Sequence, residues 1–389
     1  MRVTLEIVFW SSAGLIVWTQ VGYPLAIFLL ASVLARAPEA PSVREARPKN
    51  PPYTAVSLIV AAHDEGEVIG AKVQNALALD YPRELLQVIV ACDGCTDATA
   101  ERARAAGADL VLDLPRGGKI AAQDTAVEKA SGEIVAFSDA NALWEPDALS
   151  SLVAAFADER VGYACGRVRF VQAAGGAFAT NQEGVYWRYE MALRERESRL
   201  NSITAGNGAI YATRRDSYIV VDPIMGHDLS FPFNMVKRGW RAVDVPTARA
   251  SEKMVPSIEG EWRRKRRMMS HTWPIVVRGG MLSPKGYTVG YALMMMSHRL
   301  LRYLAPFLHL LALLANVALA VEGAGELYAV TLVLQLALLA AAVLAAAVPT
   351  RVLLIARYYV LTVASPAAGL WDWLRHGTTP SWQAAEGTR

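Results

Sequence analysis

Long apolar segments constrain this chain of 389 residues more than any other feature of its sequence. The first runs from Leu5 to Leu34 without a charged residue after Glu6, and about 20 such residues cross a hydrocarbon core as a helix. Two more lie near the C-terminus, at about 300–321 and 327–348. With 53% hydrophobic and 19% charged residues, the chain is expected to be a membrane protein with a globular part, not a disordered chain or an ordinary soluble enzyme.

Two apolar segments leave an alternative open. The first is either a retained anchor, residues 1–35, or a signal peptide, and its length favours the anchor because a signal-peptide core has only about 7–15 apolar residues. A fourth, weaker segment at Val352–Leu370 contains Arg357 and Pro366. It either crosses the membrane or lies in the interface, so the C-terminal membrane region, residues 300–375, has two or three spans.

Charge predicts the orientation and excludes one class of partner. Basic residues follow the first segment and precede the second, whereas the turn at 321–326 has no Lys or Arg. Basic loops favour the cytoplasm, so we expect a multi-pass inner-membrane protein whose globular part, residues 53–257, is cytoplasmic. A proline-rich linker at 36–52 precedes it, basic or amphipathic interfacial helices at 258–299 follow it, and 376–389 form a tail. The 39 basic and 36 acidic residues are too balanced for a nucleic-acid binder.

Within residues 53–257, short apolar runs rich in β-branched residues alternate with helical patterns. The expected strands are Val56–Ala62, Leu86–Cys92, Asp109–Leu112 and Glu133–Ser138. This alternation predicts an α/β domain with parallel strands that helices cover on both faces. In such sheets, ligands bind beyond the C-terminal ends of the strands.

Acidic residues stand at three of these strand ends. Asp93 and Asp139 directly follow their strands, Asp64 comes two residues after another, and Asp97 and Asn141 are close behind. Some of them, Asp64 and Asp97 in particular, could simply cap the next helix, since Asp and Asn favour that position. Carboxylates that converge from three strands instead suit a hard cation that holds phosphates, or hydrogen bonds to hydroxyl groups of a base or sugar.

Several motifs resemble, in order and spacing, those of the membrane-bound family 2 glycosyltransferases. They are Ala61–Glu65, Asp93–Asp97, Gly117–Lys119, Ser138–Asn141, Gly206–Ala212 with Arg214 and Arg215, Gly226–Asp228 with Gly239 and Trp240, Ser257–Arg267 and Ser297–Pro306. The resemblance implies a GT-A-type (Rossmann-like) α/β domain with a mixed sheet, plus interfacial and transmembrane helices. It also implies inverting transfer of a hexose or N-acetylhexosamine, most often from a UDP-sugar, to a lipid-linked or saccharide acceptor at the membrane.

Two other functions stay open. One is a processive polysaccharide synthase that also translocates its product, as hyaluronan, cellulose and chitin synthases do. The other is an inactive membrane protein that binds a nucleotide sugar. Processive members carry Gln-x-x-Arg-Trp where this chain has Arg263–Arg267, and the missing Trp argues against chain extension. The sequence leaves the oligomeric state open.

The resemblance implies roles for residues of the donor site. Asp93 would hydrogen-bond the uracil edge, and Ala62, Asp64 and Glu65 would line the base and ribose. Lys119 would meet the phosphates, the alternative being a solvated lysine in a turn.

The resemblance further implies a metal and a base. Asp139 would ligate Mg²⁺ or Mn²⁺ that bridges the diphosphate. Asn141 replaces the family's usual second carboxylate and would offer an amide oxygen. Asp228 would take the proton from the attacking hydroxyl, or else it caps the following helix. His227 stands where the family often has Glu.

The remaining implied residues contact the acceptor or the diphosphate. The acceptor would meet Gly206, Asn207, Gly208 and His227. Trp262, or alternatively Trp273, would substitute for the family's missing Trp as a floor for the acceptor sugar. Arg266, in the place of the family's arginine, and Arg263 would clamp the diphosphate. The run Arg263–Arg267 could instead be a cationic face on anionic lipid, worth about 1 kcal/mol per charge near the surface.

Overall fold

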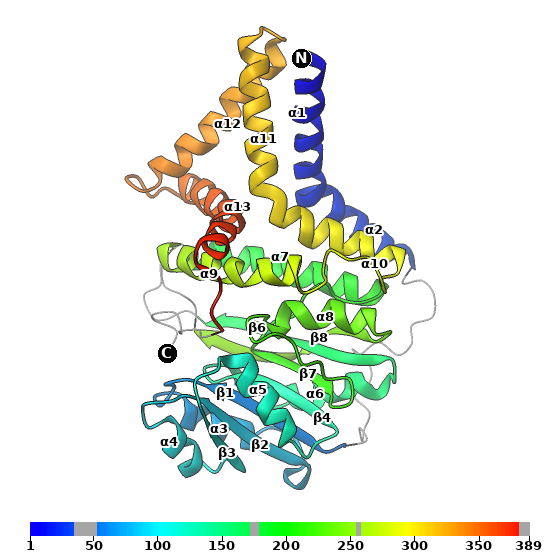
Figure 1. Cartoon of the computed structure of the whole chain (residues 1–389), viewed down its shortest axis with the longest axis vertical. Helices are drawn as coiled ribbons and strands as arrows, with labels where there is room; N and C mark the ends of the chain where they lie inside the picture. The colour runs from blue at the N-terminus through cyan, green and yellow to red at the C-terminus, as the bar shows by residue number, and fades with distance from the viewer. Residues whose placement is uncertain (35–52, 172–178, 254–257, 381–389) are drawn as a thin grey trace.

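The computed structural model describes residues 1–34, 53–171, 179–253 and 258–380, so the linker expected at 36–52 lies outside the described residues. Helices α1 (Arg2–Val17), α11 (Leu301–Val321) and α12 (Glu326–Leu344) project from one end of the molecule, and the sheet lies at the other (Figure 1). Helices α7 (Ala179–Leu200) and α9 (Ile258–Val277) run across the molecule between these two parts.

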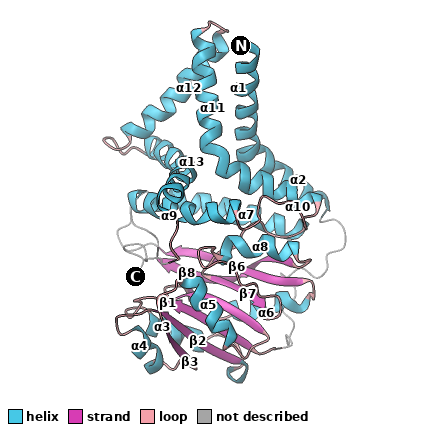
Figure 2. Ribbon diagram, viewed as in Figure 1, coloured by secondary structure: helices cyan, strands magenta, loops and turns pink. Residues whose placement is uncertain are grey.

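Eight described strands form one mixed sheet in the order β3-β2-β1-β4-β7-β6-β8-β5 (Figure 2). Strands β1 to β4 pair with one another in parallel. Strand β7 is antiparallel to both β4 and β6, and β6 pairs with β8 in parallel. The bounds are β1 Val56–Ala62, β2 Leu86–Asp93, β3 Leu110–Leu114, β4 Ile134–Asp139, β5 Leu143–Trp144, β6 Val161–Val171, β7 Ile210–Arg214 and β8 Arg241–Lys253. The first four strands thus lie where the apolar runs predicted them, and the later strands make the sheet mixed.

Both faces of the first strands are buried, which explains their uninterrupted apolar sequences. All seven residues of β1 are buried. Leu58 packs in one core cluster with residues of α6 (Ala148–Ala154), and its neighbour Ile59 packs in another with residues of α5 (Lys119–Glu128). The other helices of this part are α3 (Ile69–Leu77), α4 (Thr99–Ala105) and α8 (His227–Lys237), with 3₁₀ turns at Arg83–Leu85 and Ala155–Ala157.

Four helical segments are long and apolar enough to cross a membrane within the part of the chain that the structure describes. They are residues 2–33, 289–321, 326–344 and 351–376. The first combines α1, the π-helical turn η1 (Trp18–Gly22) and α2 (Tyr23–Leu34), and the second combines α10 (Val289–Met294), the π-helical turn η4 (Met295–Leu300) and α11. The segment that the sequence left undecided belongs to α13 (Arg351–His376), which also packs against α9, where the Trp273 indole donates to the carbonyl oxygen of Pro366 at 2.8 Å.

A buried polar junction joins the membrane helices to the sheet domain. The carboxylate of Glu197 in α7 accepts a hydrogen bond from the Tyr23 hydroxyl (2.5 Å) and lies 2.5 Å from Nδ1 of His298 in η4. The other oxygen of Glu197 accepts from the Thr204 hydroxyl at 3.0 Å. Thr204 leads directly into the Gly206–Gly208 segment, so this junction ends beside one of the predicted motifs.

A second buried ion cluster fixes α7 to the sheet. Asp244 in β8 pairs with Arg194 at 2.9 Å and with Arg167 at 2.5 Å, and the side chain of Asp244 is fully buried. Arg194, 2% exposed, also donates to the carbonyl oxygen of Gly166 at 2.8 Å. Removal of one charge from such a cluster leaves the others desolvated without compensation.

We therefore expect Asp244→Asn to destabilise the protein by about 3–5 kcal/mol, because Arg194 stays buried without its counter-charge. The midpoint of thermal unfolding in detergent measures this loss. The matched control is Asp113→Asn, whose carboxylate is 61% exposed and pairs with Arg104 on the surface, and it should cost less than about 1 kcal/mol. Equal shifts for the two variants would contradict the importance of the buried cluster.

Candidate functional site

The side chain of Lys119 joins the two halves of the sheet. Lys119 is the first residue of α5, and its ammonium group contacts the Asp139 carboxylate at the end of β4. It also lies 3.3 Å from the carbonyl oxygen of Gly208, just before β7. A Cβ at Gly208 would stand 3.1 Å from this ammonium, so the glycine permits the close approach. Lys119, Asp139 and Gly208 thus come together, and Lys119 is not a solvated turn residue.

Asp228 belongs to the same electrostatic cluster. It is the second residue of α8, and Gly226 occupies the N-cap position, so Asp228 is not the N-cap. Burial raises the pKa of the Asp228 carboxyl, the positive charge of Lys119 opposes this rise, and the negative charge of Asp139 adds to it. The backbone carbonyl of Asp228 accepts a hydrogen bond from the N–H of Gly206 at 2.7 Å. The predicted base therefore lies beside the predicted metal ligand and the glycine-rich segment.

His227 is packed beneath this cluster as a neutral group. It is 2% exposed, and its Nδ1 lies 2.7 Å from the Tyr211 hydroxyl. Its ring stacks at a tilt against Phe231, with ring centroids 4.0 Å apart. Burial and the nearby charge of Lys119 hold the pKa of His227 well below its usual value. His227 therefore supports the floor of the site, and its buried position does not favour the acceptor contact expected from the sequence.

Asp93 holds the turn that presents Lys119. Its carboxylate accepts hydrogen bonds from the backbone N–H groups of Gly117 (2.6 Å) and Gly118 (2.9 and 3.0 Å) and from the Arg116 guanidinium (2.7 Å). Gly118 needs its positive φ of 94° for this turn. Both oxygens of Asp93 accept hydrogen bonds from this turn, and the residue is only 2% exposed. Asp93 thus shapes the turn in this structure, and its expected contact with a uracil edge stays a prediction.

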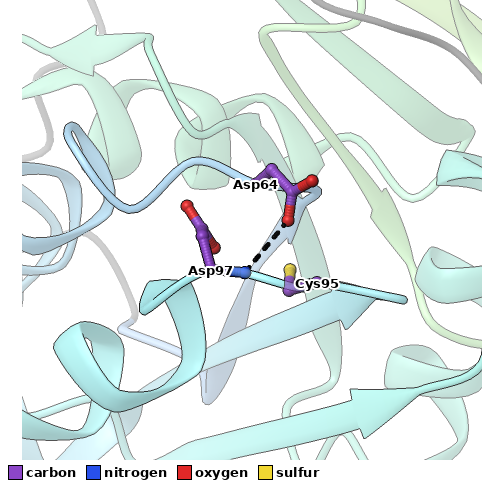
Figure 3. Close-up of side chains that lie close together, drawn as sticks. All are labelled: Asp64, Cys95 and Asp97. Carbon is purple, nitrogen blue, oxygen red and sulfur yellow. Dashed lines mark hydrogen bonds between the residues drawn. The ribbon is translucent and has the colours of Figure 1, made fainter.

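The loops after β1 and β2 are tied together by Asp64 and Asp97 (Figure 3). Asp64 accepts from the backbone N–H groups of Thr96 (2.7 Å) and Asp97 (3.3 Å), and Asp97 in turn accepts from the N–H of Gly66 at 2.9 Å. Potential ligand atoms of Asp64, Cys95 and Asp97 lie within 4.8 Å of one another. Since backbone donors already use the two carboxylates, this cluster fixes the loops, and it carries no argument for a metal.

The other donor-site residues predicted near β1 are largely buried. Ala62, 2% exposed, ends β1, and its carbonyl oxygen lies 3.4 Å from the Cys95 sulfur. Glu65 is 4% exposed, and its backbone N–H donates to the hydroxyl oxygen of Thr99 at 2.8 Å. Both residues support the loop that begins at Asp64, and neither offers a broad surface to a ligand.

Asn207 has a structural part in the glycine-rich segment. Its side-chain oxygen accepts from the N–H groups of Ala209 (3.1 Å) and Ile210 (3.0 Å), and its amide donates to the carbonyl of Gly166 at 2.7 Å. A Cβ at Gly206 would stand 2.1 Å from the Tyr163 hydroxyl. The segment is thus held close to the sheet, and Gly206 is required for that packing.

Oxygen ligands suited to a hard cation stand at the end of β4. Asp139 is the last residue of the strand, and Asn141 follows in the turn to β5. In this structure the Lys119 ammonium contacts the Asp139 carboxylate and supplies positive charge where the divalent cation would bind. Carboxylate and amide oxygens are ligands that Mg²⁺ and Mn²⁺ accept. The residues present therefore fit the divalent cation that the resemblance implies.

The consecutive basic residues of α9 lie in different surroundings. Arg266 is exposed and forms a two-pronged ion pair with Asp372 of α13 (2.5 and 2.6 Å). Arg267 is partly buried, and burial together with the charge of Arg264 lowers its pKa. His271, one turn later, interacts electrostatically with both Arg267 and Asp228. Arg266 is thus paired with α13, whereas Arg267 belongs to the group of charges around His271 and Asp228. The expected contact of Arg266 with the diphosphate stays a prediction. Arg263 is exposed and Trp262 partly buried on the same helix.

Sequence reasoning missed several charged residues near Asp139. Arg264 and Arg267 could have been found only with the rotation of α9 known. Lys72 of α3 is fully buried, and its ammonium donates to the carbonyl oxygen of Ala142 at 2.7 Å. Glu252 of β8 interacts electrostatically with Asp139, Lys119 and Lys72. Neither Lys72 nor Glu252 belongs to a motif that its neighbours in the sequence reveal.

Comparison with known proteins agrees with this fold. Residues 51–270 match the sequence model of the family described as "Glycosyltransferase like family 2". Over 174 residues the chain is 30% identical to the beta-monoglucosyldiacylglycerol synthase of Synechocystis sp., an alignment that covers 41% of this chain and 35% of that protein. Over 180 residues it is 26% identical to the glycosyltransferase AglE of Haloferax volcanii, covering 45% of this chain and 57% of that protein. The chain thus spans less than two thirds of either relative.

A solved structure resembles nearly the whole chain. The mannosyltransferase PcManGT from Pyrobaculum calidifontis, in complex with GDP-Man and Mn²⁺, superimposes with a TM-score of 0.68 at 22% sequence identity. The match covers 95% of this chain and 99% of that one. This likeness confirms the GT-A-type fold, a mixed sheet with additional helices, that the sequence predicted.

The geometry of α9 predicts unequal effects for two neighbouring arginines. We expect Arg267→Gln to weaken binding of UDP or GDP at least about tenfold, because a charge-assisted hydrogen bond to phosphate contributes about 1.5–3 kcal/mol. Arg266→Gln, which removes only the pair with Asp372, should leave nucleotide affinity nearly unchanged. Calorimetric titration of the detergent-solubilised protein measures both, and a larger loss for Arg266→Gln would contradict the assignment.

Proposed function

Because the chain belongs to the glycosyltransferase-like family 2, we propose that it is a membrane glycosyltransferase that moves a sugar from a nucleotide sugar to an acceptor hydroxyl presented at the membrane. One observation carries this proposal: Lys119, Asp139 and Asp228 share a single electrostatic cluster where the two halves of the sheet meet. A cation, an oxygen ligand and a base within one site are what transfer from a diphosphate leaving group requires.

In this proposal the donor diphosphate lies between Lys119 and α9. The Lys119 ammonium and the guanidinium of Arg267 bind its oxygens, and Asp93 keeps the turn before Lys119 in place. Asp139 and Asn141 hold the divalent cation, which when bound neutralises charge that develops on the leaving diphosphate. Ala62, Asp64 and Glu65 shape the loop next to the base and ribose.

Asp228 acts as the general base. Its carboxylate accepts the proton of the acceptor hydroxyl while the oxygen attacks the anomeric carbon and the bond to the diphosphate breaks. A single displacement of this kind inverts the anomeric configuration. His227, neutral and buried, keeps the floor of the site rigid and leaves proton transfer to Asp228. The Gly206–Gly208 segment and Trp262 face the acceptor side.

The membrane helices make a lipid-borne acceptor the favoured one. The segment around α9 is basic and the turn between α11 and α12 is acidic, so we place the sheet domain, residues 53–257, on the cytoplasmic side of the inner membrane. The interfacial helices at 258–299 and the membrane region at 300–375 then bring the site to the bilayer surface. The name of the Synechocystis relative specifies a glycosylated diacylglycerol, and PcManGT holds GDP-Man, so we propose testing both UDP- and GDP-sugars.

The test uses the full chain in liposomes with radiolabelled nucleotide sugars and either Mn²⁺ or Mg²⁺. The proposal expects release of free nucleotide and label in the lipid extract. Label in a long water-soluble polymer would instead identify a processive synthase. Nucleotide-sugar binding without transfer to any lipid or saccharide tested would overturn the enzymatic proposal in favour of a binding protein.

Asp228→Asn should lower the transfer rate by about 10²–10⁴-fold, because a positioned base typically contributes that factor. Donor affinity should change little, since Asp228 is proposed to touch the acceptor hydroxyl. The matched control is Asp216→Asn, an exposed carboxylate in the turn after β7, which should retain full activity. Full turnover by Asp228→Asn would refute the base assignment.

The pH profile tests the coupling between Lys119 and the base. Asp228 must be deprotonated to act, so activity falls as the pH drops through its raised pKa. Lys119 opposes that rise, so Lys119→Met should move the acid limb of the rate at saturating donor to higher pH. Lys129→Met, an exposed lysine just beyond α5, serves as the control. An acid limb that stays in place in Lys119→Met would show that the two groups are not coupled.

A further inference from the structure

Strand pairing places Glu252 opposite the turn that carries the proposed metal ligands. The short strand β5 follows Asp139 and Asn141 and pairs antiparallel with β8, with Leu143 opposite Ser251 and Trp144 opposite Ala250. One residue further along this register, Glu252 stands across from Ala142, the residue after Asn141. The hydroxyl of Ser251 donates to the carbonyl oxygen of Leu143 at 3.3 Å, which fixes this register.

The charges around Glu252 are those of the proposed donor site. Its carboxylate interacts unfavourably with Asp139 and favourably with Lys119, Lys72 and Arg264. Burial and the charge of Asp139 raise the pKa of Glu252 to about 7. Lys72 is committed elsewhere, to the carbonyl oxygen of Ala142, and Arg264 forms an ion pair with Glu261 at 2.7 Å.

Two carboxylates that face one charge cluster repel each other unless a cation lies between them. Ca²⁺, Mg²⁺ and Mn²⁺ are bound by such oxygen ligands, and two carboxylates balance the charge of a divalent ion. The turn after β4 supplies only one, because Asn141 stands where the second carboxylate would be. A second protein carboxylate would therefore have to come from another element of the fold.

The geometry points to Glu252 as a direct ligand of the divalent cation, supplying from β8 the second carboxylate that the Asp139–Asn141 turn lacks. This inference rests on the proposed function, which requires the cation at Asp139. It explains why a glutamate is placed beside Asp139 where, in the described part of the chain, no hydrogen bond or ion pair holds its carboxylate. It also assigns β5, only two residues long, the task of setting the distance between the two ligands.

The decisive measurement is Mn²⁺ affinity itself, read from the EPR signal of the free ion during titration of the full-length protein in detergent with GDP or UDP present. Glu252→Gln should weaken Mn²⁺ binding at least about tenfold, because mutations even of residues that support metal ligands lower metal affinity by about that factor. Glu145→Gln is the matched control, since that partly buried carboxylate pairs with Arg169 at 3.2 Å beside the same strands. Unchanged Mn²⁺ affinity in Glu252→Gln would overturn the inference.

A metal-preference test separates ligation from a merely structural role. Glu252→Cys should favour Cd²⁺ over Mn²⁺ relative to the wild type, because a thiolate is a softer ligand than a carboxylate. A glutamate that only balances Lys72 or Arg264 would leave this preference unchanged, and that result would overturn the inference. If the wild-type protein binds the nucleotide but no Mn²⁺, the metal of the proposed function is refuted as well. If the wild-type protein and Glu252→Gln bind Mn²⁺ with the same affinity, only the assignment of Glu252 is refuted.

Discussion

The contact between the Lys119 ammonium and the Asp139 carboxylate holds the candidate site together. It joins α5, which covers the parallel strands, to the end of β4, where the sheet turns into its mixed half. The same ammonium reaches the carbonyl oxygen of Gly208, and its charge influences Asp228. Lys119 therefore links motifs that are separated by as many as about a hundred residues of sequence.

The carboxylates around Lys119 need a compensating positive charge whether or not a ligand is bound. Asp139, Asp228 and Glu252 bring several carboxylates into a small, partly buried volume, and like charges in such a volume raise one another's pKa. Lys119 supplies the compensating charge in this structure. A divalent cation with a nucleotide diphosphate would take over part of that task, which would free the ammonium to contact phosphate oxygens.

Much of the fold could be predicted because its first strands are buried on both faces. Val56–Ala62 reads as an uninterrupted apolar run, and β1 has those bounds. The carboxylates of Asp93 and Asp139 at the next strand ends followed from the same pattern. The role of Asp93 could not be predicted, because its partners are backbone N–H groups of a turn, Gly117 and Gly118, that no side-chain motif describes.

Helix rotation and strand register set the other limits of prediction. Each residue turns an α-helix by about 100°, so among the five consecutive basic residues at 263–267 the sequence alone could not distinguish Arg266 from Arg267. Packing of α9 against α13 decides between them through Asp372. Glu252 escaped notice for a similar reason, since a strand as short as β5 leaves no periodic pattern in the sequence.

The junction at Glu197 has a consequence for which molecules can react. Tyr23 and His298 fix the helices of the membrane part to Glu197, and Thr204 continues from Glu197 to the segment whose Gly206 binds the carbonyl of Asp228. In the proposed function, the carboxylate of Asp228 therefore stands at a fixed distance from these apolar helices. We would then expect lipid acceptors to be selected by how far their headgroup hydroxyl extends toward Asp228.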